Sequence, residues 1–292
     1  MLKVYFDKNV LSHIISARRG AAETNGVTLD DVKSLLNAVA AGKIVNLLGV
    51  MHLQEASYAL RASSPSVAQD ELRLIKDLMH TNEIIKFPSD LLKDDVVAYA
   101  EGRNLSSPLI PNRLNLDQLF SSDGDIAERK KILDDTDTYN ANFLTVTTTA
   151  KANDREYVMT KFGGKQPTFE EFYKKKITDR IEGLVRRTEE ETKRKDLLQA
   201  CKEKTLEAML KIPSVALAEG VSLSYQYARI FEEMSEKKKK RLGDPGDLNH
   251  ALLASAADVL VTHDGDFASW VERIPNKPFR VLDHVHALLA QL

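Results

Sequence analysis

The chain has 292 residues, of which 43% are hydrophobic and 29% are charged, ordinary values for a folded soluble protein. This length and composition provide a sizeable core, in one large domain or two smaller ones, and exclude a chain too polar to fold. The formal net charge of -2 shows no overall preference for a polyanionic partner, although a local basic surface could still bind one.

Little in the sequence would direct the protein to a membrane or an oxidising compartment. The single cysteine, Cys201, cannot form an internal disulfide, which fits a reducing compartment. The chain begins with a strand-like run rather than a secretory signal, and its most apolar stretches, 44–53 and 251–262, are too short to span a bilayer. We therefore expect a cytoplasmic protein without membrane contact.

The N-terminal part of the chain alternates strand-like and helix-like segments. β-Forming residues lead directly into Asp7, and the apolar residues after it recur at helical spacing. In chain order we expect strands at 4–6, 43–50 and 84–87, and helices around 10–15 and at 27–41, 52–61, 67–80 and 91–100. Such alternation is typical of an α/β fold with a parallel sheet flanked by helices.

The pattern changes near Arg103 and returns near Asp244. Between them we expect a loop at 106–112, a helix at 126–135, a strand or extended segment at 143–149, and helices at 169–210 and 221–241. After them we expect a helix at 247–257, strands at 259–262 and 279–282, and a closing helix. The simplest organisation is an α/β core of residues 1–102 and 221–292, interrupted by a mostly helical insertion at 103–220.

The first candidate site residues are Asp7 and Asn9, which follow the first predicted strand. Ligands of open parallel sheets bind beyond the carboxyl ends of the strands, so an acid there is well placed. The alternative is that either residue only caps the next helix. Glu55 is a second candidate, because it is the only acid in an apolar segment, where acids are paired, liganded or turned to water.

Two further acidic clusters lie near the C-terminus. Asp244 and Asp247 surround the start of a predicted helix, where each can act as a cap, a ligand or both. Asp264 and Asp266 follow the strand that ends at Thr262, although Asp-Gly is also ordinary turn chemistry. Carboxylate and amide oxygens are hard ligands, which suit Mg²⁺ or Mn²⁺ rather than zinc.

The histidines indicate no zinc motif. His52, His250 and His263 are scattered along the chain, without an HExxH pattern or a cysteine pair. We interpret them as surface or core residues that are satisfied by ordinary contacts. His250 has an alternative, because it lies one turn after Asp247 and could act near a scissile phosphate.

Four segments together resemble the motifs of PIN-domain nucleases. Residues 4–11 are similar to the opening strand motif, and Glu55 stands where the family has its second acid on a helix. Residues 247–254 resemble the third motif, an Asp followed by small residues four and seven positions on. Residues 259–267 resemble the fourth, a strand that ends in Thr-x-Asp and closes on Phe. The resemblance covers 1–102 and 221–292 but not the insertion.

The resemblance implies a PIN-like, doubly wound parallel sheet whose acids surround one or two cations, Mg²⁺ or Mn²⁺. The implied catalytic and metal-binding acids are Asp7, Glu55, Asp247 and Asp264, with Asp266 as a further ligand and Asn9, Thr262 and Asp244 in support. The implied activity is endonucleolytic hydrolysis of RNA, giving a 5′-phosphate and a 3′-hydroxyl. Many relatives are toxins of toxin–antitoxin pairs, so an antitoxin or other protein partner and a homodimer remain open. A DNA or flap-type nuclease and a catalytically weak RNA-binding or partner-binding module are the alternatives.

Three basic runs could hold the phosphate backbone of a nucleic acid. One run directly precedes the third acidic cluster and consists of Lys237, Lys238, Lys239, Lys240 and Arg241. The other two runs are 174–176 and 193–195, and five aromatic residues could stack bases: Phe169, Phe172, Tyr173, Tyr225 and Tyr227. Acids interleave with these runs, so a solvated helix face is the alternative, as is a buried core for the aromatic residues.

Overall fold

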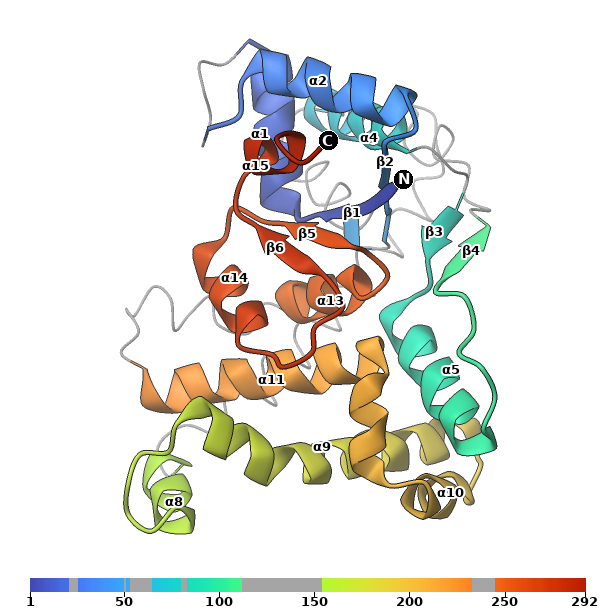
Figure 1. Ribbon diagram of the computed structural model, residues 1–292, viewed down its shortest axis with the longest axis vertical. Coiled ribbons are helices and arrows are strands. Elements are labelled where there is room, and N and C mark those ends of the chain that lie inside the picture. Colours follow the sequence, from blue (N-terminus) through green and yellow to red (C-terminus); the bar gives the residue numbers. More distant parts are fainter. Residues whose placement is uncertain (21–25, 50, 53–64, 80–82, 112–153, 233–244) are drawn as a thin grey trace.

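The computed structural model describes residues 1–20, 26–49, 51–52, 65–79, 83–111, 154–232 and 245–292 (Figure 1). Its centre is a four-stranded parallel sheet in the order β2 (Ile44–Asn46), β1 (Leu2–Phe6), β5 (Val259–Val261) and β6 (Arg280–Leu282). A parallel bridge from Leu48 to Ile84 joins the chain after β2 to β3 (Glu83–Ile85), which pairs antiparallel with β4 (Leu109–Pro111). The expected α/β class with a parallel sheet is therefore confirmed.

One face of the sheet is covered by α1 (Lys8–Arg18), α2 (Leu29–Ala40), α4 (Pro65–Leu78) and α15 (Val285–Leu289) (Figure 1). Successive strand side chains alternate between faces, so Val4 and Phe6 pack into this layer whereas Tyr5 packs into the other. α2 begins at a capping box, in which the Thr28 hydroxyl accepts from the Asp31 amide and the Asp31 carboxylate accepts from the Thr28 amide.

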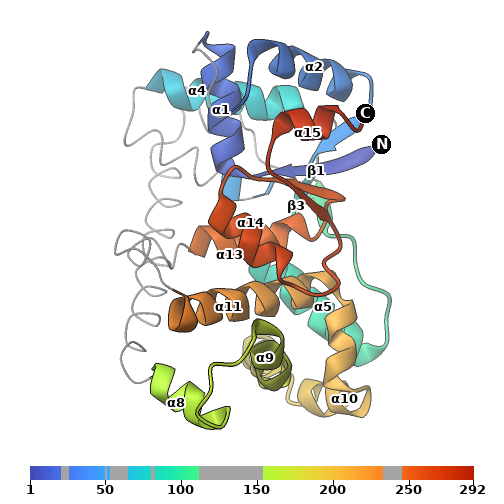
Figure 2. The same cartoon turned by 60° about the vertical axis from the view of Figure 1, so that its left-hand side comes forward.

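The opposite face packs against α5 (Pro88–Glu101), α11 (Pro213–Phe231), α13 (Pro245–Ala254) and α14 (Gly265–Glu272) (Figure 2). Two glycines in this layer allow the backbone to approach a neighbouring side chain closely. A Cβ atom on Gly49 would lie 2.6 Å from Leu253 Cδ1, and one on Gly220 would lie 2.8 Å from Ile274 Cγ2. A larger residue at either position would have to displace the side chain that it meets, Leu253 or Ile274.

A third layer of helices lies beyond α11: α8 (Asp154–Lys161), α9 (Phe169–Thr192), α10 (Leu197–Glu203) and the 3-10 helix η1 (Leu206–Lys211) (Figure 2). Its apolar side chains form one core cluster with residues of α5 and α11, including Val96, Leu223 and Phe231. This third core cluster therefore joins the outer helices to helices that also cover the sheet.

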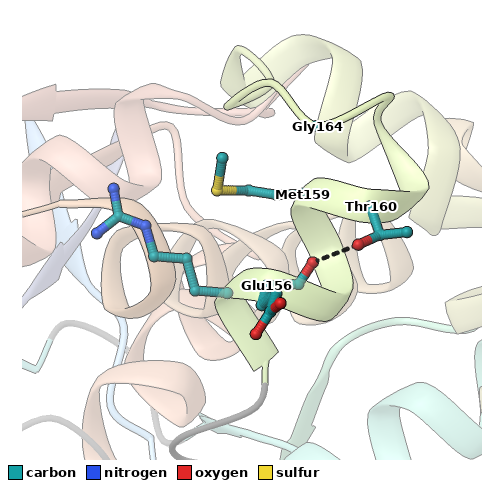
Figure 3. A pocket seen from close by; sticks show the side chains of 5 residues that line it. Glu156, Met159, Thr160 and Gly164 are labelled. Atoms are coloured by element: carbon teal, nitrogen blue, oxygen red, sulfur yellow. Dashed lines mark hydrogen bonds between the residues drawn. The ribbon is translucent and has the colours of Figure 1, made fainter.

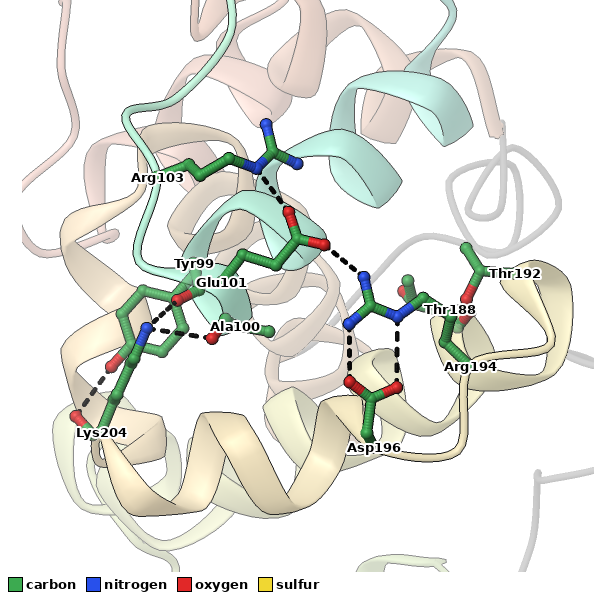
Figure 4. A network of polar contacts seen from close by, with 9 residues as sticks. All are labelled: Tyr99, Ala100, Glu101, Arg103, Thr188, Thr192, Arg194, Asp196 and Lys204. Carbon is green, nitrogen blue, oxygen red and sulfur yellow. Dashed lines mark hydrogen bonds and ion pairs between the residues drawn. The ribbon is translucent and has the colours of Figure 1, made fainter.

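A polar network links the end of α5 to the segment between α9 and α10 (Figure 4). The Glu101 carboxylate accepts from Arg103 and Arg194, and the Arg194 guanidinium also donates to both carboxylate oxygens of Asp196. Lys204 donates to two backbone carbonyl oxygens near the end of α5, each at 2.9 Å. The side chains of Glu101 and Arg194 are 33% and 35% exposed, so water still screens these pairs and each contributes little stability.

Several boundaries expected for the helical layer are wrong. The helix expected at 169–210 is divided into α9, α10 and η1, because the chain turns at Lys193, whose φ is 57°. The helix expected at 221–241 begins at Pro213, so the expected boundary between 220 and 221 lies inside α11. β4 lies within the expected loop at 106–112, and α8 and α14 have no counterpart among the predicted elements. The segments 126–135 and 143–149 lie outside the described residues.

Candidate functional site

Asp7 and Thr262 meet where the neighbouring parallel strands β1 and β5 end. Asp7 directly follows β1 and is buried, with 5% of its surface exposed. The Thr262 hydroxyl donates to Asp7 Oδ2 at 2.8 Å and accepts from the Asp264 amide at 3.1 Å. One hydroxyl therefore orients the Asp7 carboxylate and also fixes the turn that leads into α14. We call the place formed by Asp7, Thr262 and Asp264 the acidic edge.

Asp264 is the N-cap of α14. Its Oδ1 atom accepts from the Asp266 amide at 2.9 Å and from the Phe267 amide at 3.0 Å. The turn-and-cap interpretation therefore accounts for these hydrogen bonds. Capping does not exclude a ligand role, because the positive end of the helix dipole favours a carboxylate at this position. Asp266 lies half-buried in the first turn of the same helix.

Asp247 lies half-buried in the first turn of α13. The helix is tied to β1 by a hydrogen bond of 2.7 Å between the Tyr5 hydroxyl and His250 Nδ1. Tyr5 precedes Asp7 by two residues, and His250 follows Asp247 by three. This bond therefore joins the helix that carries Asp247 to the strand that leads into the acidic edge.

A tyrosine of α11, Tyr225, lies near Asp247, and sequence reasoning had considered this residue only for base stacking. Burial raises the pKa of Tyr225, whereas the nearby charge of Arg229 lowers it and the charge of Asp247 raises it. The Tyr225 ring also packs edge-on against Trp270, with 5.8 Å between the ring centroids. Arg229 is thus a cation beside Tyr225, which in turn lies near one of the predicted acids. A single arginine near the end of a helix forms no motif, so sequence reasoning missed it.

The histidines are scattered along the sequence, but in the structure five of them gather in two clusters. In the first, His52 and His250 lie buried beside Tyr5, with 5.7 Å between the two imidazole centroids. His52 Nδ1 accepts from the Gly49 amide at 3.1 Å, so Nε2 carries the proton and donates to the Phe6 carbonyl at 2.6 Å. His250 is 2% exposed, which does not support the alternative of direct action on a scissile phosphate.

The second cluster consists of His13 on α1, His263 after β5 and His284 at the N-cap of α15. The Nδ1 atoms of His13 and His263 are 2.5 Å apart, and the two rings stack with 4.8 Å between centroids. Burial lowers the pKa of His263 to about 4, assisted by the charges of the other two histidines. Burial also lowers the pKa of His13, although the nearby Asp7 charge opposes it.

One residue in each of the basic runs at 174–176 and 193–195 pairs with acids. Lys174 pairs with Glu170 at 2.6 Å, where both side chains are well exposed, and Arg194 belongs to the network of Figure 4. These pairs favour the solvated-face alternative over RNA binding. Four of the five aromatic residues considered for base stacking are buried instead: Phe172, Tyr173, Tyr225 and Tyr227.

Several expected site residues lie outside the described residues: Glu55, Asp244 and the basic run at 237–241. Asn9 is exposed in the first turn of α1. Among the residues that the structure describes, no group of three or more His, Cys, Asp or Glu side chains is arranged to hold a metal ion. The described part of the predicted site is therefore the acidic edge, with Asp247 on a helix tied to β1.

A surface hollow of ≈ 400 Å³ lies on α8 and the turn after it, away from the acidic edge (Figures 1 and 3). It is lined by Arg155, Glu156, Met159, Thr160 and Gly164. The Thr160 hydroxyl is engaged with the Glu156 backbone carbonyl at 2.8 Å. The lining has a single carboxylate and no paired acids, so it offers no arrangement for phosphodiester chemistry.

With this geometry described, the chain can be compared with known proteins. No protein family, curated protein or solved structure matches it. Within the described segments, no helix is both long and apolar enough to cross a membrane. A function for this chain is therefore proposed from the chemistry of its own residues.

Proposed function

We propose that the chain is a Mg²⁺- or Mn²⁺-dependent nuclease that hydrolyses RNA phosphodiester bonds. The supporting observation is the Thr262 hydroxyl, which joins Asp7 and Asp264 where two parallel strands end. Ligands of open parallel sheets bind at this edge, and a carboxylate already oriented there loses little freedom when a ligand arrives. RNA as the substrate comes from the resemblance of four segments to PIN-domain motifs.

The donor chemistry fits a hard divalent cation. Asp7, Asp247, Asp264 and Asp266 offer carboxylate oxygens, the ligands that Mg²⁺ and Mn²⁺ prefer. In this proposal they hold the cation together with Glu55, which lies outside the described residues. A bound divalent cation lowers the pKa of water, offsets the phosphate charge and stabilises the leaving oxygen.

The chain's own contribution is to hold the acids in place. Thr262 holds the Asp7 carboxylate, and the two capping bonds hold the Asp264 side chain. The bond between Tyr5 and His250 holds the helix that carries Asp247. Each of these contacts fixes the position of a carboxylate and adds no charge of its own. Loss of a contact should therefore lower the rate of RNA cleavage because a metal-binding carboxylate is displaced.

A second candidate is an α/β module that binds RNA or a protein partner without cleavage. Two observations favour it. The hydrogen bonds of Asp264 are those of a helix cap, and within the described part of the chain no three metal-ligating side chains form a group. A DNA or flap-type nuclease would use the same acids as the leading proposal. Cleavage assays separate these functions.

The test is cleavage of labelled single-stranded RNA and DNA, side by side, with and without Mn²⁺. We expect RNA cleavage that requires the cation. Asp7→Asn keeps the shape of the side chain and removes its charge, so the rate should fall by about a hundredfold or more. The circular dichroism spectrum should not change.

Asp258→Asn is the matched control, because Asp258 lies at the other end of β5 and accepts from the Lys3 amide at 2.8 Å. It should keep the wild-type rate. A wild-type rate for Asp7→Asn would remove Asp7 from the site. Cleavage of DNA alone would favour the DNA nuclease, and RNA binding without cleavage would favour the non-catalytic module.

A further inference from the structure

One buried acid outside the acidic edge is paired with a hydroxyl rather than with a cation. Asp95 lies on α5 with 5% of its surface exposed, and the Ser214 hydroxyl of α11 donates to its Oδ2 atom at 2.5 Å. We propose that Asp95 makes the junction of α5 and α11 sensitive to pH, because the contact holds while the carboxyl is protonated and weakens when it ionises. This proposal does not rest on nuclease activity.

Glu219 shows how this fold accommodates a buried carboxylate. It is 3% exposed and accepts from the guanidinium groups of Arg180 and Arg187, at 2.7 Å and 3.3 Å. Asp95 is buried to a similar extent, but the one side chain that donates to it among the described residues is a neutral hydroxyl. A buried charge is costly unless it is both paired and hydrogen-bonded, so the ionised form of Asp95 is poorly accommodated.

The cation that acts on Asp95 is bound to other groups. Lys86 Nζ donates to Asp94 Oδ2 and to Ser106 Oγ, each at 2.8 Å. Burial raises the pKa of Asp95 above its usual value and outweighs the hydrogen bond from Ser214 and the charge of Lys86, which lower that pKa. The charge of Asp94 adds to the increase.

Titratable groups on the other helices that pack against α5 are engaged elsewhere. Glu219 of α11 pairs with Arg180 of α9. Lys204, which follows α10, donates to two backbone carbonyl oxygens near the end of α5. His250 of α13 is hydrogen-bonded to Tyr5. The charges that act on the buried carboxyl are therefore those of the neighbouring lysine and aspartate described above.

The direction of the pKa change sets the direction of the pH response. An aspartate in an unfolded chain has a pKa of about 3.9, and that of Asp95 in the fold is higher. The stability that Asp95 contributes is therefore fully present below about pH 4 and is lost as the pH rises through the pKa of the folded state. Both α5 and α11 have residues in the sheet-facing core cluster and in the third cluster, so the loss falls where these layers join.

The test compares thermal unfolding of the full-length wild type and Asp95→Asn at several pH values from about 4 to 8. Asparagine keeps the shape of the side chain and cannot ionise. The melting temperature of the variant minus that of the wild type should increase by at least about 3 °C over this range, whatever its value at the acid end. At the alkaline end, amide hydrogen exchange in α5 and at the start of α11 should be slower in the variant, because that junction opens less often.

Asp90→Asn is the matched control, because Asp90 lies on the same helix with its side chain 51% exposed and paired with Lys93. Its melting temperature relative to the wild type should not increase with pH.

Ser214→Ala removes the hydroxyl that supports the ionised carboxyl. Its melting temperature relative to the wild type should fall as the pH rises, and this pH dependence should disappear when Asp95→Asn is also present. The proposal is overturned if the difference between Asp95→Asn and the wild type stays constant or decreases from acid to alkaline pH. If Asp95→Asn does not fold, Ser214→Ala decides alone, and a constant difference from the wild type overturns the proposal.

Discussion

A single hydroxyl, that of Thr262, donates to the Asp7 carboxylate and accepts from the Asp264 amide. Thr262 is 1% exposed, so water cannot easily take its place. A valine of the same shape would leave a buried carboxylate with one donor fewer and an amide without its acceptor. The contribution of the Thr262 hydroxyl to the free energy of unfolding can therefore be measured separately from any catalysis.

Thr262→Val should lower the free energy of unfolding by about 1–3 kcal/mol, the typical penalty for leaving a buried polar group without its partner. Thr262→Ser keeps the hydroxyl and removes only a methyl group, so its loss should be about 1 kcal/mol. Urea unfolding at pH 7 measures both. Equal stability of the valine variant and the wild type would mean that the hydroxyl does not hold the edge together.

β1, β2, β3, β5 and β6 were predictable because their apolar residues are continuous and turn signals bound them, whereas β4 lies in a segment rich in serine and proline and was missed. The positions of Asp7 and Asp264 after β1 and β5 were predictable for the same reason. α14 was missed because Asp264 and Gly265 are equally typical of a turn, and only the two capping bonds show that a helix begins there. The contact of His13 with His263 joins residues 250 positions apart, which no local spacing can indicate.

The division of the long helix expected at 169–210 has a tertiary cause. The residues around Lys193 include good helix formers, and nothing local ends the helix. Arg194 instead binds Glu101 of α5, and the Glu189 carboxylate accepts from the Leu198 amide at 3.0 Å at the start of α10. Contacts with other helices therefore override the local helix propensity at this position.

Glu219 joins α11 to α9 through the most buried of the described ion pairs. It is 3% exposed and accepts from Arg180 at 2.7 Å and Arg187 at 3.3 Å. The arginine side chains are 39% and 59% exposed, so water screens the pairs from their side. Removal of the glutamate charge leaves two hydrated cations rather than two buried ones.

Glu219→Gln should therefore lower the free energy of unfolding by about 1–2 kcal/mol, less than the 3–5 kcal/mol typical when a fully buried pair is broken. Arg180→Ala should destabilise the fold more than Arg187→Ala, because Arg180 also donates to Ser222 at 2.5 Å. Arg186→Ala, on the same helix but in an exposed pair with Glu182, is the control and should be near wild type. The reverse order of the two arginine variants in thermal unfolding would contradict this account.

The helices of the third layer share their core with α5 and α11, and those two helices also pack against the sheet (Figure 2). α11 has residues in both clusters: Leu217 and Val221 face the sheet side, whereas Leu223 and Tyr227 face α9. Deletion of the expected insertion, residues 103–220, would remove the first part of α11 together with the outer layer. The described residues thus form continuous packing from the sheet to α9.

Deletion of 103–220 should consequently yield an insoluble or unfolded protein. The cut would uncover Val96, Leu223, Tyr227 and Phe231, all buried in the intact chain. Exposure of a large apolar side chain costs roughly 1.5–3 kcal/mol, so the four together lose about 6–12 kcal/mol. The total stability of a native protein is only about 5–15 kcal/mol. Removal of Leu217 from the sheet-facing cluster adds to this loss.

Soluble expression, size-exclusion chromatography and thermal unfolding measure the outcome. A second deletion variant with Leu223→Lys, Tyr227→Lys and Phe231→Lys separates two causes of failure. If uncovered apolar surface alone is responsible, these substitutions should restore a soluble protein. If the missing half of α11 is responsible, the second variant should also fail, because Leu217 is still absent from the core that packs on the sheet. A deletion variant that is soluble without these substitutions and unfolds cooperatively would instead establish 1–102 and 221–292 as an independent domain.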